Sequence, residues 1–302
     1  MKLLAIVGAG RSGTNLLAQT LAADGEHIKN LYENRYIWSY GQADRRCDVR
    51  GAEDATPRVQ RYISAHFARR GERSKTAVLI DKTPSNALRI PFLAQVFPDV
   101  LVLNIIRDGR DNMVSRARQR DLARVHGARG GSLVGGTQLV ARRILHLSRL
   151  MQRGNLPVDR LPVALFDSVS GLTRHALGKG PPPYGERVAG LAACLASEGP
   201  DAAAAFQWRE TVVAAHRAGR ALGPRQYLEI RFEDLMTDPQ RTLATVFSFI
   251  GCKQHGGARA YLRDQLKTPR PPPRQRTDPA RLAALERHLR PTLEHFGYVW
   301  ET

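Results

Sequence analysis

The sequence predicts an α/β fold: a P-loop-like parallel sheet flanked by helices, with a helical insertion over the sheet rim. Apolar runs of strand-like composition alternate with helical patterns, and each run ends in a polar cluster. The runs are residues 3–7, 76–80 and 100–106, and their clusters are residues 8–14, 81–86 and 107–115. Strands that alternate with helices form parallel sheets, whose ligands bind at the carboxyl ends of the strands. We therefore expect the three clusters to share one edge of the sheet.

The first cluster, Gly8-Ala9-Gly10-Arg11-Ser12-Gly13-Thr14, is a glycine-rich turn that leads into a helix over residues 14–23. Glycines let successive backbone N–H groups point inward, and the helix N-terminus adds a partial positive charge. Arg11 supplies a cation, and the hydroxyls of Ser12 and Thr14 supply further donors. The turn indicates an anion site, although a glycine turn without a ligand remains the alternative.

The residues missing from the turn limit which anion it can bind. A nucleoside-triphosphate loop has the pattern G-x-x-x-x-G-K-[ST]. Here the outer glycines have that separation, but no lysine follows and the cation, Arg11, lies inside the loop. The glycines also match the dinucleotide fingerprint G-x-G-x-x-G. The acid that this fingerprint requires about 20 residues later has only Glu26 or Glu33 as candidates.

The remaining elements follow from apolar periodicity and from proline or glycine at helix ends. In chain order we expect a short strand near 27–31, a loop over 41–56, a helix from 57 to 67, a helix from 84 or 85 to 97, a helix after 111, a long helix over 201–222, a strand at 226–230, a helix from 239 to 250, a loop over 267–276 and a closing helix from 282 to 296.

The region from 127 to about 199 has a different character. It contains glycine clusters, a basic amphipathic helix near 139–150 and a proline run at 181–183. We expect this region to be the variable helical insertion over the sheet rim, within a single domain that covers residues 1–302.

The net charge of the 302 residues is +18, which favours anionic partners such as phosphates, sulfates, nucleic acid or an anionic membrane face. Nucleic-acid binding requires basic residues on one face with aromatic residues for stacking. Here the basic residues are spread along the chain and only 7% of residues are aromatic. A non-catalytic basic nucleic-acid-binding protein is kept as an alternative, but we expect no nucleic acid as partner.

Cys47, Cys194 and Cys252 lie far apart and form no C-x-x-C pair, so we expect neither a disulfide framework nor a metal site. Such cysteines fit a reducing compartment, and we expect a cytoplasmic protein. The apolar start is short and leads straight into the glycine turn, so we interpret it as a strand and not as a signal peptide. No apolar run approaches the length of about 18 residues that a transmembrane segment needs.

Four ordered segments resemble the PAPS-dependent sulfotransferase family, in its bacterial type. They are Gly10–Thr14, Asp81–Pro84, Ile106–Asp111 with Ser115, and Tyr227–Leu235 with Asp238 and Pro239. The first is similar to the family's 5′-phosphosulfate loop and the third to its 3′-phosphate motif. The resemblance covers residues 1–120 and 225–300. It implies transfer of a sulfuryl group from PAPS, with PAP as product and no metal.

The resemblance implies two anion sites, because PAPS is an adenosine that carries a 5′-phosphosulfate and a 3′-phosphate. The residues implied for the phosphosulfate are Gly10, Arg11, Ser12, Gly13, Thr14 and Asn15, where Asn15 replaces the family's usual second threonine. Arg107 and Ser115 are implied for the 3′-phosphate, which an arginine fork fits. The alternative for Arg107 is a salt bridge to Asp108 or Asp111 at a helix start.

Two further residues are implied for the chemistry. Lys82, assisted by Arg11, would take the charge of the bridging oxygen as the S–O bond breaks; otherwise Lys82 is a surface lysine in a turn. Glu33-Asn34-Arg35 is similar to the Glu-x-Arg of tyrosylprotein sulfotransferases, which implies Glu33 as general base and Arg35 as an acceptor-binding residue. The alternative for Glu33 is a solvated glutamate in a loop.

Other choices are left open by the sequence. Cytosolic small-molecule sulfotransferases use a histidine as base, and His27, His126 and His146 are the candidates for that role in this chain. The hydroxyl acceptor is a glycan, a lipid, a small molecule or a peptide tyrosine, because the insertion expected on the acceptor side carries no readable motif. A P-loop kinase that uses ATP and Mg²⁺ is the alternative enzyme. The oligomeric state is not predicted.

Overall fold

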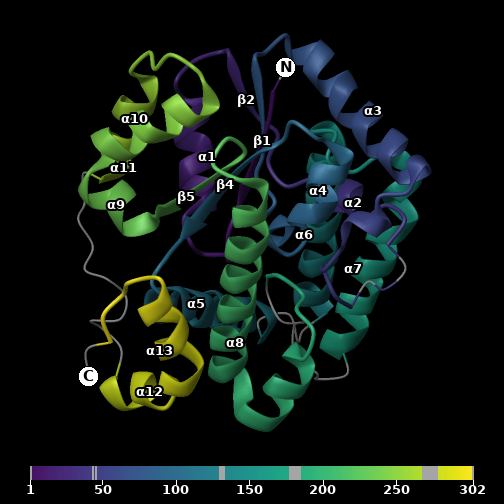
Figure 1. The fold of residues 1–302 in the computed structure, drawn as a ribbon. Helices are drawn as coiled ribbons and strands as arrows, with labels where there is room; N and C mark the ends of the chain where they lie inside the picture. The colour runs from purple at the N-terminus through teal and green to yellow at the C-terminus, as the bar shows by residue number, and fades with distance from the viewer. Residues whose placement is uncertain are drawn as a thin grey trace.

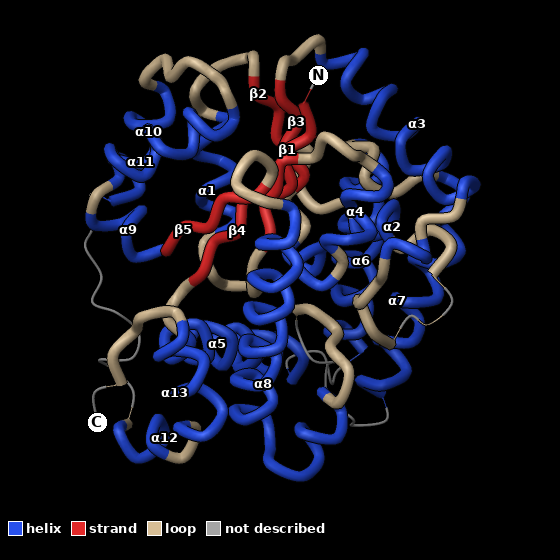
Figure 2. The backbone as a smooth tube through the Cα atoms, viewed as in Figure 1, coloured by secondary structure: helices blue, strands red, loops and turns tan. Residues whose placement is uncertain are grey.

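The sheet at the centre of the molecule has five parallel strands (Figures 1 and 2). The computed structural model describes residues 2–42, 44, 46–128, 133–176, 185–266 and 278–300. The strands, in the order β2-β3-β1-β4-β5 across the sheet, are β1 (Lys2–Val7), β2 (Ile28–Asn30), β3 (Val78–Asp81), β4 (Leu101–Ile106) and β5 (Tyr227–Arg231). Because neighbouring strands pair in parallel, their carboxyl ends meet at one edge. The predicted fold class is confirmed.

Helices surround this sheet (Figure 1). The helices of the first part of the chain are α1 (Thr14–Ala22), α2 (Arg35–Trp38), α3 (Pro57–Ser74), α4 (Ile90–Val96) and α5 (Gly109–Ala128). Those that follow are α6 (Leu133–Gln152), α7 (Leu161–Ala176), α8 (Leu191–Leu222), α9 (Phe232–Thr237), α10 (Pro239–Ile250), α11 (Gly257–Leu266), α12 (Pro279–Ala283) and α13 (Glu286–His295). Among the described helices, none is both long and apolar enough to cross a membrane.

Both faces of the sheet are buried. Leu4 of β1 packs with side chains of α1, α10 and α11. Its neighbours Leu3 and Ala5 point to the other face, since successive strand residues alternate, and pack with side chains of α2, α3 and α4. Burial on both faces explains why β1 is a continuous apolar run in the sequence.

A third apolar cluster lies between α5, α8 and α13. Trp208 of α8 is fully buried in it, and its Nε1 donates a hydrogen bond to the carbonyl oxygen of Arg107 at 3.1 Å. Gly109, the first residue of α5, lies against the same indole ring, where a Cβ atom would come within 2.8 Å. The long helix α8 therefore holds the turn that follows β4.

The helical insertion contains α6 and α7, which pack next to α2. The buried side chains of this contact are Tyr36, Leu147, Leu156 and Ala164. Asn155 lies between the two helices and is buried. Its Nδ2 donates to the carbonyl oxygens of Leu31 and Glu33, at 2.8 and 3.0 Å. The insertion thus holds the backbone that follows β2, at the carboxyl edge of the sheet.

Several predicted boundaries differ from the structure. The helix expected from Pro84 is a 3-10 turn (Pro84–Leu88) followed by α4, and Asn86 in that turn donates to the carboxylate of Asp81 at 2.7 Å. The long helix α8 starts ten residues earlier than expected and breaks at Gly199, where φ is 85. The closing helix is divided into α12 and α13, and the sequence pattern predicts neither α9 nor α11. The proline run at 181–183 and the loop expected over 267–276 lie outside the described residues.

Gly8→Ala should destabilise the fold. Gly8 has a φ of 142, and a Cβ atom there would lie 2.4 Å from the backbone oxygen of Ile105 on β4. Backbone strain and this contact should together lower the free energy of unfolding by about 2–5 kcal/mol, measured by urea denaturation.

Gly256→Ala is the matched control for that substitution. Gly256 also has a positive φ of 96, but nothing lies within 4 Å of an added Cβ. It should therefore cost only the backbone strain, on the order of 1 kcal/mol. Equal losses in the two variants would show that the sheet relaxes around the added methyl group.

Candidate active site

The glycine-rich loop between β1 and α1 has a tightly defined backbone. Gly8, Arg11 and Gly13 have φ values of 142, 74 and 93. A Cβ atom at Gly13 would lie 2.4 Å from the ring of Phe232, which follows β5. The left-handed conformation of Arg11 costs strain that a side chain rarely tolerates, and such strain clusters at functional sites.

Polar side chains from distant parts of the chain hold this loop. Nδ2 of Asn112 on α5 donates to the carbonyl oxygen of Gly10 and to Oγ of Ser12, both at 3.0 Å. The backbone N–H of Gly10 donates to Oε1 of Glu186 at 2.6 Å. Glu186 is buried and forms an ion pair with Arg116 at 2.7 Å. The sequence did not predict these residues, and the only signal for them was the four-residue spacing of Asn112 and Arg116 on one helix.

Arg11, Arg107 and Ser115, predicted for two separate anion sites, belong to one hydrogen-bonded group. Nη1 of Arg107 donates to the carbonyl oxygen of Arg11, and Nε of Arg11 donates to Oγ of Ser115, both at 3.1 Å. The Arg107 guanidinium lies over the ring of Phe232, 4.5 Å from its centroid. Nε of Arg107 is buried without a hydrogen-bond partner among the described residues. An unpaired buried guanidinium N–H at this edge fits an anionic ligand.

The charge of Arg107 is only partly compensated by its surroundings. Burial lowers its pKa, and the carboxylates of Asp111 and Glu233 oppose that effect. Asp108, the next residue, forms an ion pair with Arg110 at 2.8 Å. An arginine remains charged at neutral pH even with a lowered pKa. Arg107 therefore presents a cation at the carboxyl edge.

Asp81, the last residue of β3, is a fully buried carboxylate surrounded by donors. Oδ1 accepts from Nδ2 of Asn34 at 2.6 Å and from Oγ1 of Thr83 at 3.0 Å. Oδ2 accepts from Nε1 of Trp38 at 2.9 Å and from Nδ2 of Asn86 at 2.7 Å. Burial raises the pKa of Asp81 to about 6, and the hydrogen bonds oppose this rise. The carboxylate ties β3 to α2 and to the segment that precedes α2.

Lys82 and Glu33, the two residues predicted for the chemistry, are in contact. Nζ of Lys82 donates to Oε1 of Glu33 at 2.5 Å. The Lys82 side chain is 8% exposed, whereas that of Glu33 is 49% exposed. The backbone N–H of Lys82 also donates to the carbonyl oxygen of Tyr32 at 3.0 Å. Lys82 is therefore buried against the end of β2, while the carboxylate of Glu33 stays open to a ligand.

The other predicted residues lie close to these groups in the chain. Thr14 is buried in the first turn of α1, and Asn15 next to it is exposed. Arg35 is the first residue of α2, and its guanidinium lies 3.9 Å from the carboxylate of Asp167 on α7. The side chain of Arg35 is 52% exposed. This places Arg35 between the end of β2 and the insertion.

The three histidines that are candidate bases are placed differently. His27 precedes β2, and its carbonyl oxygen accepts from the backbone of Val78 at the start of β3, so it lies at the opposite end of the sheet from Glu33. Burial, together with the charges of Arg143 and Arg35, lowers the pKa of His146 on α6, while Glu33 opposes this. The side chain of His126 lies outside the described part of the chain.

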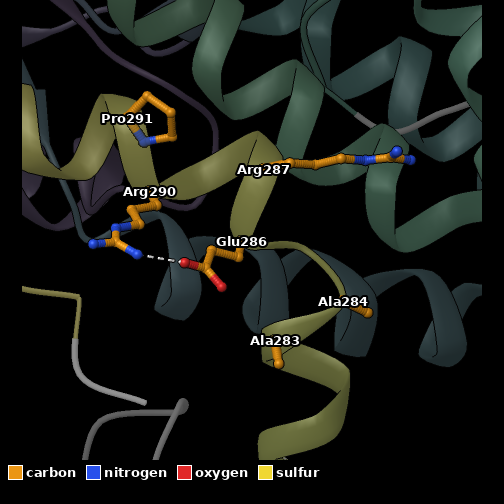
Figure 3. A pocket seen from close by; sticks show the side chains of 6 residues that line it. All are labelled: Ala283, Ala284, Glu286, Arg287, Arg290 and Pro291. Atoms are coloured by element: carbon orange, nitrogen blue, oxygen red, sulfur yellow. Dashed lines mark hydrogen bonds and ion pairs between the residues drawn. The ribbon is translucent and has the colours of Figure 1, made fainter.

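Two hollows on the described surface lie elsewhere. One, of about 430 Å³, lies on α12 and α13 (Figure 3), where Arg290 forms an ion pair with Glu286; the two side chains are 2.6 Å apart. The other, of about 710 Å³, runs along β5 and is lined by His216 and Arg231 among others. Neither is lined by a residue predicted for the site. The candidate site is therefore defined by converging polar groups and not by these hollows.

A parallel sheet with a glycine-rich turn between its first strand and first helix is the architecture of a P-loop-like α/β protein. The model of the sulfotransferase family matches residues 4–161 and 193–255, and the chain belongs to this family. No sequence among the curated proteins is similar enough to count as a relative.

Two solved structures share the fold across the whole chain. The sulfotransferase domain of the Synechococcus PCC 7002 olefin synthase is 17% identical, with a TM-score of 0.54, and the match covers 100% of this chain and 96% of that one. The sulfotransferase domain from the curacin biosynthetic pathway is 12% identical, with a TM-score of 0.51, and the match covers 99% of each chain. At these identities the likeness concerns the fold.

Asp81→Asn should remove a pH-dependent contribution to stability. The carboxyl pKa rises from 3.8 to about 6 on folding, so the folded state binds more protons than the unfolded state between these values. The stability that Asp81 contributes should therefore fall as the pH rises from 4 to 6, by up to about 3 kcal/mol. The difference in unfolding free energy between wild type and variant, from urea denaturation at pH 4 to 7, measures this slope.

At pH 7 the Asp81→Asn variant should still be less stable than the wild type, by about 1–3 kcal/mol. The NH₂ group of the new asparagine would face donors that bond the carboxylate in the wild type, and two donors cannot form a hydrogen bond with each other. Asp234→Asn, which changes an exposed carboxylate on α9, is the control. Parallel pH curves for the wild type and Asp81→Asn would contradict the raised pKa.

Proposed function

We propose that the chain transfers a sulfuryl group from PAPS to a hydroxyl acceptor by in-line displacement. The observation that supports this proposal is the presence of two polar groups at the same edge of the sheet. Arg11, Arg107 and Ser115 form the first group, and Lys82 with Glu33 forms the second. In-line transfer needs an anion-binding group and a base in the same site. Membership of the sulfotransferase family supports sulfuryl transfer.

In this proposal the glycine-rich loop holds the phosphosulfate of PAPS. Residues 10–15 would offer backbone N–H groups at the N-terminus of α1, where the helix favours an anion. Arg107 and Ser115 would hold the 3′-phosphate. The guanidinium fork of Arg107, with its unpartnered Nε, suits a phosphate. Arg11 would link the two anion sites, since its backbone lies in the loop and its side chain bonds Ser115.

PAPS would supply the sulfuryl group, whose bond to the 5′-phosphate breaks as a bond to the acceptor oxygen forms. Glu33 would take the proton of the acceptor hydroxyl, and its half-exposed carboxylate is accessible to such an acceptor. Lys82 would stabilise the charge on the departing phosphate oxygen. The contact between the two side chains orients Glu33, and its backbone is held by Asn155 of the insertion. Arg35, at the insertion, would contact the acceptor.

His146 is the second candidate for the base. Its lowered pKa leaves the imidazole neutral at pH 7, as a base requires. The charges of both Glu33 and Arg35 act on His146, which supports a role close to the residues proposed for the acceptor.

Binding of PAP tests the donor site. Arg107→Ala should weaken PAP binding by about 1.5–3 kcal/mol, the usual worth of a hydrogen bond to a charged group, and Ser115→Ala by about 1 kcal/mol. Isothermal titration without metal measures both. Adenosine 5′-phosphosulfate has no 3′-phosphate, so its affinity should be equal in wild type and Arg107→Ala.

Arg118→Ala, which removes an exposed arginine from α5, is the control for lost positive charge. Unchanged PAP affinity in Arg107→Ala would remove that residue from the donor site. Stabilisation of the protein by ATP with Mg²⁺ but not by PAP would favour the kinase alternative.

Single-turnover sulfuryl transfer tests the chemistry, once an acceptor has been found by screening. Glu33→Gln should leave PAP affinity near that of the wild type and slow transfer by about 10²–10⁴-fold. Lys82→Ala should slow it by about 10²–10³-fold. Because the two side chains touch, the double variant should lose less than the product of the single losses.

Full activity in Glu33→Gln would exclude it as the base, and His146→Ala would then be expected to lose activity instead. Full activity in Lys82→Ala would mean that Lys82 serves only to hold the end of β2.

A further inference from the structure

The insertion carries most of the large apolar side chains that are exposed on the described surface. They are Ile144, Leu145 and Met151 on α6, Val158 between the helices, and Leu165, Phe166 and Val169 on α7, with exposed fractions between 39% and 73%. The others, Val49, Val213 and Val299, are scattered over distant parts of the chain. Single exposed apolar residues are ordinary, whereas a group of them marks an interaction surface. We call this group the α6–α7 apolar surface.

On α7 this surface faces away from the packed side of the helix. On α7, Ala164 is buried in the cluster that includes Tyr36 and Leu147. Phe166 is 66% exposed, and two residues along a helix correspond to a rotation of about 200°. Leu165 and Val169, four residues apart, share one side of α7. On α6, Leu145 is likewise two residues from the buried Leu147, whereas Ile144 and Met151, three and four residues from it, are exposed on the side of that contact.

The exposed residues of the two helices belong to neighbouring turns. Nε of Arg143 on α6 donates to Oγ of Ser168 on α7 at 3.1 Å. Ile144 follows Arg143 directly, and Val169 follows Ser168. The side-chain contact thus brings the apolar positions of both helices to the same part of the molecule.

The charge of the same segment is strongly positive. Residues 133–176 contain six arginines and two acidic residues. Asp159 accepts a hydrogen bond from Tyr62, and Asp167 lies near Arg35. Arg149 and Arg153 are exposed, and the guanidinium of Arg153 lies over the ring of Tyr32, 4.3 Å from its centroid. The segment that carries the α6–α7 apolar surface therefore also carries exposed cations such as Arg149.

We propose that the α6–α7 apolar surface docks onto a lipid bilayer that contains anionic headgroups. Helices that present apolar side chains together with arginines are typical of segments that lie in the membrane interface. A second copy of the chain fits less well, because a symmetric contact would bring the arginines of both copies together. This inference does not depend on the proposed sulfuryl transfer.

Vesicle sedimentation with the full chain tests the docking. The wild type should partition at least about tenfold more strongly onto vesicles of phosphatidylcholine with phosphatidylglycerol than onto phosphatidylcholine alone. A basic protein shows some of this preference by charge alone. The decisive variants are therefore those that leave the net charge of the protein unchanged. The double variant Ile144→Ser and Phe166→Ser should lower partitioning onto the mixed vesicles by about tenfold or more. The double variant Val213→Ser and Val299→Ser, which removes exposed apolar side chains elsewhere, should partition as the wild type does.

The depth of insertion gives an independent readout. Fluorescence of Phe166→Trp should shift to the blue on mixed vesicles, and that of Val213→Trp should not. Equal partitioning of both double variants, without a blue shift, would overturn the proposal in favour of charge alone. The proposal would be overturned in favour of a second copy if the wild type were a dimer that does not bind vesicles. In that case the double variant Ile144→Ser and Phe166→Ser should be monomeric.

Discussion

The buried carboxylate of Asp81 is the interaction on which the candidate site depends. It receives hydrogen bonds from the segment before α2, from α2 itself and from the turn after β3. Burying a charge is costly unless donors surround it, and here the donors come from both the segment that leads into α2 and the turn that follows β3. Their positions are therefore coupled to one another through this carboxylate. Glu33 immediately precedes one of the donors, and Lys82 immediately follows Asp81, so the contact between Glu33 and Lys82 depends on the same network.

The glycine-rich loop is held by a second network, which reaches further along the chain. Glu186 lies 176 residues from Gly10, yet its carboxylate receives the N–H of that glycine and also pairs with Arg116. Two buried opposite charges stabilise a fixed geometry only when further hydrogen bonds satisfy them. Arg116 meets this condition, because it also donates to Asn112 and to Gln207 of α8. The loop conformation is thus set by α5 and α8 as much as by its own glycines.

The sequence predicted the fold where local chemistry decides it. Apolar runs indicated β1 and β4, because strands buried on both faces are mostly apolar; the one polar residue of β4, Asn104, is buried and donates to Tyr227. The rule that strand ends share one edge brought Arg11, Lys82 and Arg107 into one candidate site. Contacts between residues far apart in the sequence could not be predicted. No local pattern indicates that Glu33 contacts Lys82, or that Arg11 donates to Ser115. The sequence pattern puts Asp81 in a ligand motif, whereas in the structure its carboxylate is surrounded by internal donors.

The insertion has an inner side that holds the backbone of the candidate site and an outer side that exposes apolar residues. Asn155 fixes the backbone of Glu33 from the inner side, and Arg70 of α3 donates to the adjacent carbonyl of Arg153 at 2.7 Å. The outer side leaves apolar residues such as Phe166 in contact with solvent, which costs solvation free energy unless another surface covers them. Asn155 and Phe166 are joined by η3 (Val158–Arg160) and the start of α7, so the residue that holds the Glu33 backbone and the exposed apolar side chains belong to one continuous segment.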